Sequence, residues 1–186
     1  MEKRIYLLRH CEAEGQSSQS PLTINGKSQS EKLCEFFSKM NIQRIISSPF
    51  VRAVQTIERL SKKIELEIEI DKRLSERRLS SEDLPDWLEK LKVTYDDFDL
   101  KLPGGESSRE AAARIRQTVD DVLLNDNTDT VIIVTHGNIL SLLINQFDNH
   151  FGFDQWRKMS NPDVYLLTYP NENYHIERMW KEEYNV

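Results

Sequence analysis

The chain has 186 residues, with 25 basic and 31 acidic side chains, 38% apolar residues and a formal net charge of −6. This length suffices for a full hydrophobic core without a metal or disulfide framework. The negative balance argues against a nucleic-acid or anionic-membrane surface, because both partners need a basic face, but it does not exclude a small anion in a pocket. With two cysteines and no signal-peptide or membrane-span pattern, the reducing cytoplasm is the expected location.

Strand-like and helix-like stretches alternate from the start of the chain. Residues 3–9 are predicted to form a buried strand, and residues 24–40 carry the apolar stripe of an amphipathic helix. A short strand at residues 44–46 leads to Ser48, which can cap a helix, and to Pro49, which suits its first position. The helix that follows is expected to bury Phe50, Val54, Ile57 and Leu60.

The middle of the chain contains weaker signals. Residues 65–70 alternate charged and apolar side chains, as an exposed or edge strand does, and this strand is a candidate edge for pairing in a homodimer. Residues 80–92 are predicted to form a helix with Trp87, Leu88 and Leu91 pointing inward.

After a predicted turn at residues 103–105, the pattern becomes regular again. Ser107 and Glu110 match the capping box that opens a helix. Residues 130–135 are the most β-branched run in the chain and are predicted to form a central strand that is covered on both faces. A nearly all-round apolar helix is expected at residues 139–147. Two strands, at residues 164–169 and 174–180, are expected to follow, joined by a turn at residues 170–173.

This alternation predicts a three-layer α/β/α fold with a mostly parallel central sheet, and an antiparallel edge near its end. No repeat, low-complexity tract or long linker divides the sequence, so residues 1–186 are expected to form a single domain. In such sheets ligands bind outside the carboxyl ends of the strands. The residues at those ends are Arg9, His10, Arg52, His136 and Gly137.

These strand ends carry residue types that bind or attack phosphate. The start of a helix is an anion site because its backbone N–H groups are free, and Arg52 on the first turn strengthens it. A single histidine at a strand end is usually structural. Two arginines and two histidines at neighbouring strand ends, however, would crowd positive charge together unless an anion compensates it. The pattern therefore leaves two alternatives open, a shared oxyanion site and a set of unrelated residues.

Several short motifs resemble those of one known family. The stretches LLRHCEAEGQ, SSPFVRAVQT, RLSER, PGGES and VTHGN are similar, in order and approximate spacing, to motifs of the histidine phosphatase superfamily. That superfamily includes the cofactor-dependent phosphoglycerate mutases. The resemblance spans about residues 3–140, and it implies a phosphoglycerate mutase-like fold.

The resemblance also implies a role for each matching residue. His10 corresponds to the nucleophile that forms a phosphohistidine, Glu76 to the proton donor and acceptor, and His136 to the second histidine, which stabilises the transition state. The phosphate-binding positions that it implies are Arg9, Arg52, Gln16 and Gly137.

These residue types suit phosphoryl transfer without a metal. The neutral imidazole of His10 can attack phosphorus and split one difficult displacement into two steps. Positive charge from the arginines and from a protonated His136 would neutralise the phosphoryl oxygens, the task of Mg²⁺ in metal-dependent enzymes. Glu76 would protonate the leaving alkoxide and later activate water. No metal or other cofactor is therefore expected.

The sequence departs from the family pattern at three positions. Cys11 stands where the family has a glycine, and its side chain is expected to narrow the pocket or make it oxidisable. Gln16 replaces an asparagine that touches the phosphate in many relatives, and its longer amide can still donate. Asn138 stands where a second glycine is frequent.

The leading hypothesis is a metal-independent phosphomonoesterase that acts on a small phosphorylated metabolite and releases inorganic phosphate. A segment of about residues 75–105, called the cap segment below, is predicted to cover the pocket, which favours small substrates. Its candidate specificity residues are Arg77, Arg78 and Trp87. The alternatives are a phosphoglycerate mutase, a phosphatase of protein phosphohistidine or phosphotyrosine, and a non-catalytic binder of phospho-ligands. Mutases of this family are usually longer, which places the mutase second.

Overall fold

Among the residues that the structure describes, six strands form one mixed sheet at the centre of the molecule. The computed structural model describes residues 3–125, 127–169 and 173–180. The strands are β1 (Arg4–Arg9), β2 (Arg44–Ser47), β3 (Ile68–Ile70), β4 (Thr130–Thr135), β5 (Asp163–Thr168) and β6 (His175–Arg178). Their order across the sheet is β3-β2-β4-β1-β5-β6. The first four strands in this order are parallel to one another. Strand β5 pairs antiparallel with β1, and β6 pairs antiparallel with β5, which confirms the predicted arrangement of the sheet.

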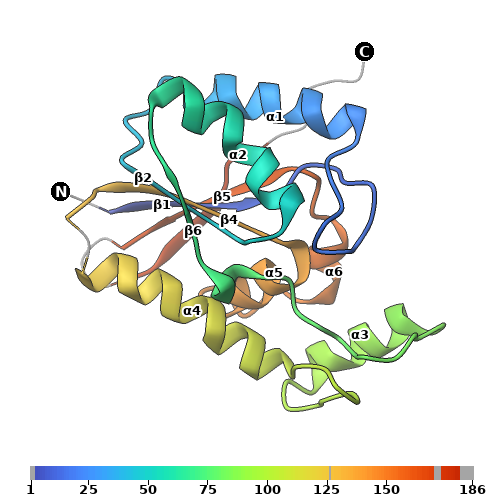
Figure 1. Cartoon of the computed structure of the whole chain (residues 1–186). Helices are drawn as coiled ribbons and strands as arrows, with labels where there is room; N and C mark the ends of the chain where they lie inside the picture. The colour runs from blue at the N-terminus through green and yellow to red at the C-terminus, as the bar shows by residue number, and fades with distance from the viewer. Residues whose placement is uncertain (1–2, 126, 170–172, 181–186) are drawn as a thin grey trace.

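Helices cover both faces of the sheet (Figure 1). On one face lie α1 (Ile24–Phe37) and α2 (Val51–Ile64), and on the other α4 (Ser108–Asn125) and α5 (Gly137–Asn145). The shorter helices are η1 (Lys72–Leu74), α3 (Trp87–Asp96) and α6 (Phe153–Arg157). The predicted three-layer α/β/α fold is thus confirmed. Within the part of the chain that is described, no helix has the length and apolar character needed to cross a membrane.

Strand β4 is central because both of its faces are buried. Its side chains alternate between two apolar clusters: Val131 and Ile133 face α4 and α5, whereas Ile132 and Val134 face α1 and α2. Successive side chains of a strand point to opposite faces, so a run of β-branched residues fills both clusters at once. The β1–β4 register then places Thr135, the last residue of β4, beside the end of β1.

Helix α2 begins later than predicted, and the expectation that Ser48 caps it is wrong. The helix starts at Val51, with Phe50 in the N-cap position and Pro49 outside it. The Ser48 hydroxyl is directed at His136 instead. The inner face shifts accordingly, and its buried residues are Arg52, Ala53, Thr56, Ile57 and Leu60, while Phe50 and Val54 are only half-buried. Arg52 thus lies on the inner face of α2.

The predicted helix of the cap segment is displaced toward the C-terminus. The Ser81 N–H donates to the Pro103 carbonyl at 2.9 Å, which ties the chain down in a non-helical conformation before α3 begins. Leu91 is buried as predicted. Trp87 and Leu88 are 49% and 38% exposed, so their predicted inward orientation is wrong.

Most other elements agree with the prediction to within a few residues. The capping box of α4 is present, since the Ser107 N–H donates to Glu110 at 2.9 Å and the Glu110 N–H donates to Ser107 at 3.1 Å. Two predicted helices end earlier than expected, at Phe37 and Asn145. Strands β5 and β6 pair as predicted. Of the turn between them, residues 170–172 lie outside the described residues.

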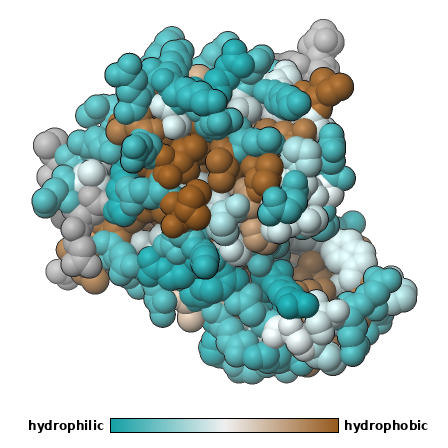
Figure 2. All heavy atoms as spheres, viewed as in Figure 1, coloured by the Kyte–Doolittle hydropathy of each residue, from teal (hydrophilic) through white to brown (hydrophobic). Residues whose placement is uncertain are grey.

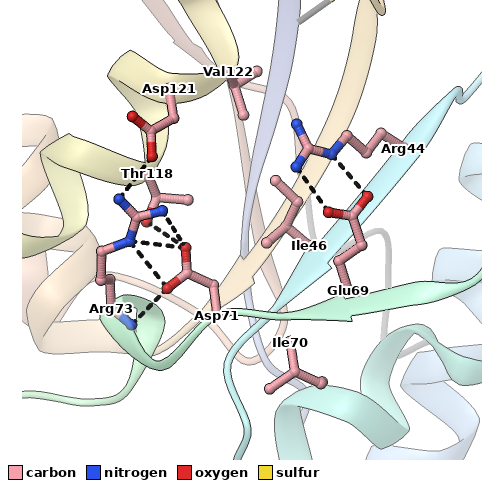
Figure 3. A pocket seen from close by; sticks show the side chains of 9 residues that line it. All are labelled: Arg44, Ile46, Glu69, Ile70, Asp71, Arg73, Thr118, Asp121 and Val122. Carbon is pink, nitrogen blue, oxygen red and sulfur yellow. Dashed lines mark hydrogen bonds and ion pairs between the residues drawn. The ribbon is translucent and has the colours of Figure 1, made fainter. Parts of the chain in front are cut away.

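Strand β3 forms one edge of the sheet, as predicted. Apolar side chains gather on the side of the molecule that faces the viewer in Figure 2. Ile70 on β3 is 54% exposed. Pairing of two copies along this edge stays a prediction. A pocket of about 340 Å³ lies between β3 and α4. Its charged side chains pair with one another (Figure 3), Arg44 with Glu69, and Arg73 with Asp71 and Asp121.

Candidate active site

His10 lies directly after β1, at the carboxyl edge of the sheet. Its backbone N–H donates to the Thr135 carbonyl at 3.0 Å, which extends the β1–β4 pairing by one residue. Its Nδ1 lies 2.6 Å from the Cys11 carbonyl oxygen. A carbonyl can only accept, so Nδ1 carries the ring proton and Nε2 keeps a free lone pair.

Arg52 points from the first turn of α2 to this lone pair, and it is only 1% exposed. Its Nε donates to His10 Nε2 at 3.2 Å, and its Nη1 donates to the carbonyls of Gln16 and Ser17 at 3.2 and 2.7 Å. The guanidinium carbon lies 4.9 Å from the centroid of the Phe50 ring. These contacts fix a positive charge beside the His10 imidazole.

Arg9, the last residue of β1, lies against Gly137. Its Nη1 donates to the Met159 carbonyl at 3.0 Å, and its Nε is buried with no partner among the described residues. A Cβ atom at Gly137 would lie 2.9 Å from both Cζ and Nε of Arg9. The absence of a side chain at Gly137 therefore provides the space that the Arg9 guanidinium occupies.

His136 occupies the N-cap position of α5 and is fully buried. Its Nε2 lies 2.7 Å from the Ser48 hydroxyl, which itself accepts the Phe50 N–H at 3.3 Å. If the Ser48 hydroxyl donates its proton to Nε2, the ring proton of His136 lies on Nδ1. Nδ1 is buried without a partner in the described part of the chain. The rings of His10 and His136 are 5.0 Å apart between centroids.

Glu76 reaches the start of α5 from the stretch that follows η1. One carboxylate oxygen accepts the N–H groups of Arg77 and Ile139 at 2.8 and 3.0 Å, and the other accepts the Asn138 N–H at 3.1 Å. Three backbone N–H groups thus fix the position of this carboxyl group, two of them at the start of α5. The same helix therefore begins at His136 and holds Glu76.

Burial and neighbouring charges set the protonation of the two histidines. Burial is the main cause that lowers the pKa of His10 to about 3, and the charges of Arg52 and Arg9 add to it, against the opposing hydrogen bond to Cys11. Burial, then the charges of His10, Arg52 and Arg9, lowers the pKa of His136 well below its usual range. These neighbours favour the neutral form of His136, and the protonated ring expected during phosphoryl transfer stays a prediction. The positive charge comes from Arg9 and Arg52, since a guanidinium stays charged in proteins.

Gln16 differs from the other predicted site residues because its side chain is exposed. Its contact with the site is the backbone carbonyl that accepts from Arg52. The predicted role of its amide in phosphate binding stays a prediction. Arg9, His10, Arg52, Glu76, His136 and Gly137 all lie at the carboxyl edge of the sheet and at the starts of α2 and α5.

Cys11 points away from the site. Its side chain is fully buried in the apolar cluster beneath α1 and α2, and its N–H donates to Thr56 Oγ1 at 2.9 Å. Burial raises the pKa of the thiol to about 12. The expectation that Cys11 narrows the pocket or makes it oxidisable is therefore wrong, because the strand end turns this side chain into the core.

Arg77 is not a rim residue, so its assignment as a specificity residue is wrong. It is buried and donates through Nη1 to Thr94 and Ser108 at 2.9 and 3.0 Å. Its Nε and Nη2 donate to the Glu106 carbonyl at 3.1 and 3.0 Å. Arg77 thus fastens the cap segment to the start of α4. Arg78 and Trp87 are exposed and stay candidates.

Three residues that support the site were not assigned to it from the sequence. Ser48 contacts His136, Thr56 accepts the N–H of residue 11, and Asn161 Nδ2 donates to the His10 carbonyl at 2.7 Å. Thr56 carries a weak signal, because it lies four residues after Arg52 on the inner face of α2. Asn161 carries none, because its partner is 151 residues away. No group of three or more His, Cys, Asp or Glu side chains within the described ranges is arranged to hold a metal ion.

Fold and site together define a class of protein. It is an α/β protein in which the guanidinium groups of Arg9 and Arg52 lie near an unprotonated histidine nitrogen at a strand end, an arrangement that suits phosphoryl transfer through histidine. A family model of the histidine phosphatase superfamily (branch 1) matches residues 5–182. The chain therefore belongs to the histidine phosphatase superfamily, as its motifs predicted, and is an enzyme of this group of phosphatases and mutases.

The similar proteins include one that is named as a probable mutase and one that is named as a phosphatase. Probable phosphoglycerate mutase GpmB of Serratia proteamaculans is 31% identical over 157 residues, which cover 76% of this chain and 73% of the relative. A solved structure of Bacillus stearothermophilus YhfR is 24% identical, with a TM-score of 0.78 over 95% of this chain and 96% of the other. Mycobacterial glucosyl-3-phosphoglycerate phosphatase, solved with inorganic phosphate, is 22% identical, with a TM-score of 0.77 over 96% of each chain. At these identities the two structures show the shared fold.

Proposed function

We propose that the chain is a metal-independent phosphomonoesterase that hydrolyses a small phosphorylated metabolite through a phosphohistidine on His10. The observation that carries the proposal is the 2.6 Å hydrogen bond between His10 Nδ1 and the Cys11 carbonyl, because it leaves Nε2 unprotonated. The low pKa of His10, about 3, keeps the imidazole neutral and nucleophilic at physiological pH.

In the first step, the Nε2 lone pair of His10 forms a bond to phosphorus while the bond between phosphorus and the ester oxygen breaks. The leaving oxygen keeps the bonding electron pair and takes the proton of the Glu76 carboxyl group. The phosphorylated ring keeps its Nδ1 proton on the Cys11 carbonyl, whose oxygen stabilises the positive charge that the ring acquires.

The two arginines balance the charge of the phosphoryl oxygens. Arg9 and Arg52 bring guanidinium groups from two different elements, and His136 adds Nδ1–H as a neutral donor. When the substrate binds, the Arg52 Nε–H donates its hydrogen bond to a phosphoryl oxygen instead of to His10 Nε2. Donors that are already in place stabilise the transition state without reorganisation, so no metal or other cofactor is required.

In the second step, the Glu76 carboxylate takes a proton from a water molecule whose oxygen attacks phosphorus. The bond between phosphorus and His10 Nε2 breaks, its electron pair returns to the nitrogen, and inorganic phosphate leaves. Glu76 is protonated again and is ready for the next cycle.

The cap segment belongs to the proposal as the part that selects the substrate. Residues 1–186 are taken as one histidine phosphatase domain, in which the cap segment closes the site over a small phosphate ester. Arg78 and Trp87 are exposed on this segment and are the candidates for contact with the alcohol half of the substrate. A cytoplasmic location is part of the same proposal.

The first experiment measures turnover of phosphomonoesters, including p-nitrophenyl phosphate and a panel of phosphorylated metabolites, in the presence of EDTA. We expect turnover that EDTA leaves unchanged, and acid-labile phosphate trapped on His10 after rapid quenching. His10→Ala should abolish trapping and lower kcat/KM by about 10³-fold or more, whereas the exposed His150→Ala should change neither. Turnover that persists in His10→Ala, or that requires an added metal after EDTA treatment, contradicts the proposal.

A phosphoglycerate mutase is the second candidate, because GpmB of Serratia proteamaculans is named as a probable one and is 31% identical. With 3-phosphoglycerate as substrate, the hydrolase releases phosphate, whereas a mutase forms the 2-phosphate isomer faster than phosphate. The same assay with a phosphohistidine or phosphotyrosine peptide tests the phosphoprotein alternative. Tight phosphate binding without any turnover would support a non-catalytic binder.

A further inference from the structure

Tyr95 links the cap segment to the start of α5. It lies in the last turn of α3, and its ring packs edge-on against Phe153, with 5.8 Å between centroids. Its hydroxyl accepts the Asn138 amide N–H at 2.9 Å and lies 2.5 Å from the Ser141 hydroxyl. A polar group of the cap segment thus reaches into the first turn of the helix that begins at His136.

The three polar groups form a closed ring of hydrogen bonds. The Ser141 hydroxyl donates to the Asn138 carbonyl at 2.6 Å, so the Tyr95 hydroxyl is the donor in its contact with Ser141. The ring runs from the Asn138 amide to Tyr95, to Ser141, and back to the Asn138 carbonyl. Every member donates and accepts within the ring, and such chains strengthen and orient one another. Side chain and backbone of Asn138 are therefore both fixed.

Asn138 also holds the proposed proton donor. Its backbone N–H donates to Glu76 Oε2 at 3.1 Å, beside the N–H of Ile139 on Oε1 at 3.0 Å. Two hydrogen bonds through Asn138 therefore separate the Tyr95 hydroxyl from the Glu76 carboxylate. Burial raises the pKa of Tyr95, so its hydroxyl keeps the proton that the ring requires.

We propose that Tyr95 is a positioning residue for Glu76, which it orients through Asn138 when the cap segment is docked. This inference rests on the proposed function, because it takes Glu76 as the acid that protonates the leaving oxygen. The link makes proton donation depend on the cap segment, while nucleophilic attack by His10 does not use this link. Protonation of the leaving group is therefore fully effective only when the cap segment is seated.

The test compares two esters of similar size that differ in their need for a proton. Phenoxide needs protonation as it leaves phenyl phosphate, whereas 2,4-dinitrophenoxide is a stable anion. Tyr95→Phe should lower kcat/KM for phenyl phosphate by about tenfold and change that for 2,4-dinitrophenyl phosphate by about twofold or less. The ratio kcat/KM is used because it reports formation of the phosphoenzyme and not its hydrolysis.

Two further variants separate positioning from general damage to the fold. Asn138→Gly keeps the backbone N–H on Glu76 but removes the amide that Tyr95 holds, so it should give the same selective loss. Tyr174→Phe removes a tyrosine hydroxyl that accepts from Arg116 at 2.7 Å, outside the catalytic and binding residues, and should leave both esters unaffected. Thermal unfolding confirms that each variant is folded.

Glu76→Gln distinguishes failure of this inference from failure of the proposed function. If Glu76→Gln shows no selective loss on phenyl phosphate, the proposed function is wrong about its proton donor. If it shows that loss, while Tyr95→Phe and Asn138→Gly slow both esters equally or neither of them, the positioning role is overturned and the proposed function stands. Selective loss in all three variants supports the inference.

Discussion

The carboxyl edge of the sheet and the cap segment are held in place in different ways. At the sheet edge, backbone pairing sets the positions: Arg9 lies opposite Thr135 in the β1–β4 register, and the His10 N–H continues the same ladder. In the cap segment, side chains do much of this work, because buried Arg77 joins it to the start of α4 and Tyr95 joins it to α5.

This difference separates the chemistry from the choice of substrate. Backbone ladders that are buried on both faces fix the nucleophile and Arg9, and they tolerate little change. A segment fastened by a few polar side chains can change its sequence and shape while the sheet stays the same. Under the proposed function, this chain's sheet would fix the reaction and its cap segment the choice of alcohol, with the contact between Tyr95 and Asn138 joining the two.

Among substitutions that keep the catalytic side chains, the largest expected effect on activity is that of Gly137→Ala at the sheet edge. The new Cβ would lie 2.9 Å from the end of the Arg9 side chain, so the guanidinium must move while the backbone stays in place. We expect kcat/KM to fall by about 10²-fold with little loss of stability, because misplacing a charge-stabilising group is costly. Steady-state kinetics and thermal unfolding measure the two effects.

Gly152→Ala is the matched control for this substitution, because its Cβ would meet no atom closer than 3.8 Å. Its kcat/KM should stay within about twofold of the unmodified protein, as for a surface substitution. If Gly137→Ala is as active as the unmodified protein, the space beside Arg9 is not needed for activity. The sheet edge then tolerates more substitution than we infer.

The next effect concerns the cap segment and Arg77→Met. This change removes the donors that bond Thr94, Ser108 and the Glu106 carbonyl. A hydrogen bond to a charged group contributes about 1.5–3 kcal/mol. We expect the amide hydrogens of α3 to exchange at least about tenfold faster, while those of β1 and β4 are unchanged. Hydrogen exchange followed by mass spectrometry reads this out. Arg78→Met, at an exposed neighbour, should leave α3 protected, and equal acceleration in the strands would refute the separation of the two regions.

The same separation decides what the sequence could predict. The parallel sheet was predictable because buried strands are marked by local patterns such as the β-branched run of β4. The residues His10, Arg52 and His136 were predictable as a group because a known rule places ligands at strand ends, and the family motifs agree with it. The structure places all three together there.

Features that depend on distant partners were not predictable. Ser48 looked like a helix cap, but its hydroxyl bonds His136, 88 residues further along the chain. Arg77 was expected to be a specificity residue of the pocket, yet it is buried and bonds residues 94 and 108. The direction of the Cys11 side chain depends on how the chain leaves β1, which no periodic pattern records.

The pH dependence of stability tests the sheet edge as a buried, cationic site. The pKa of His10 is lowered to about 3 and that of His136 is also lowered, so in acid the unfolded chain binds protons that the folded one does not. Stability is therefore expected to fall as the pH falls below about 6.5, by up to roughly 1.4 kcal/mol per pH unit for each histidine. Urea unfolding at several pH values measures this slope.

Carboxylates also titrate in acid, so substitution of a histidine is needed to separate its contribution to the pH dependence of stability from theirs. His10→Asn should reduce the slope of unfolding free energy against pH by the contribution of one proton. The substitution His150→Asn, at an exposed histidine, should leave this slope unchanged. An unchanged slope in His10→Asn would mean that His10 takes up its proton in the folded state, in conflict with its burial beside two arginines.

The smallest expected effect on activity is that of Cys11→Gly, which restores the residue of the family motif. Because the thiol is buried beneath α1 and α2, its removal should leave a small cavity and cost about 1–2 kcal/mol of stability. It should change kcat/KM by no more than about twofold, since the backbone carbonyl that fixes the His10 proton stays in place. Cys34→Gly, at the other buried cysteine, serves as the control for a buried thiol that lies away from the strand end. A several-fold gain in kcat/KM for Cys11→Gly alone would show that this side chain restricts the site after all, and that the core and the sheet edge are coupled at this residue.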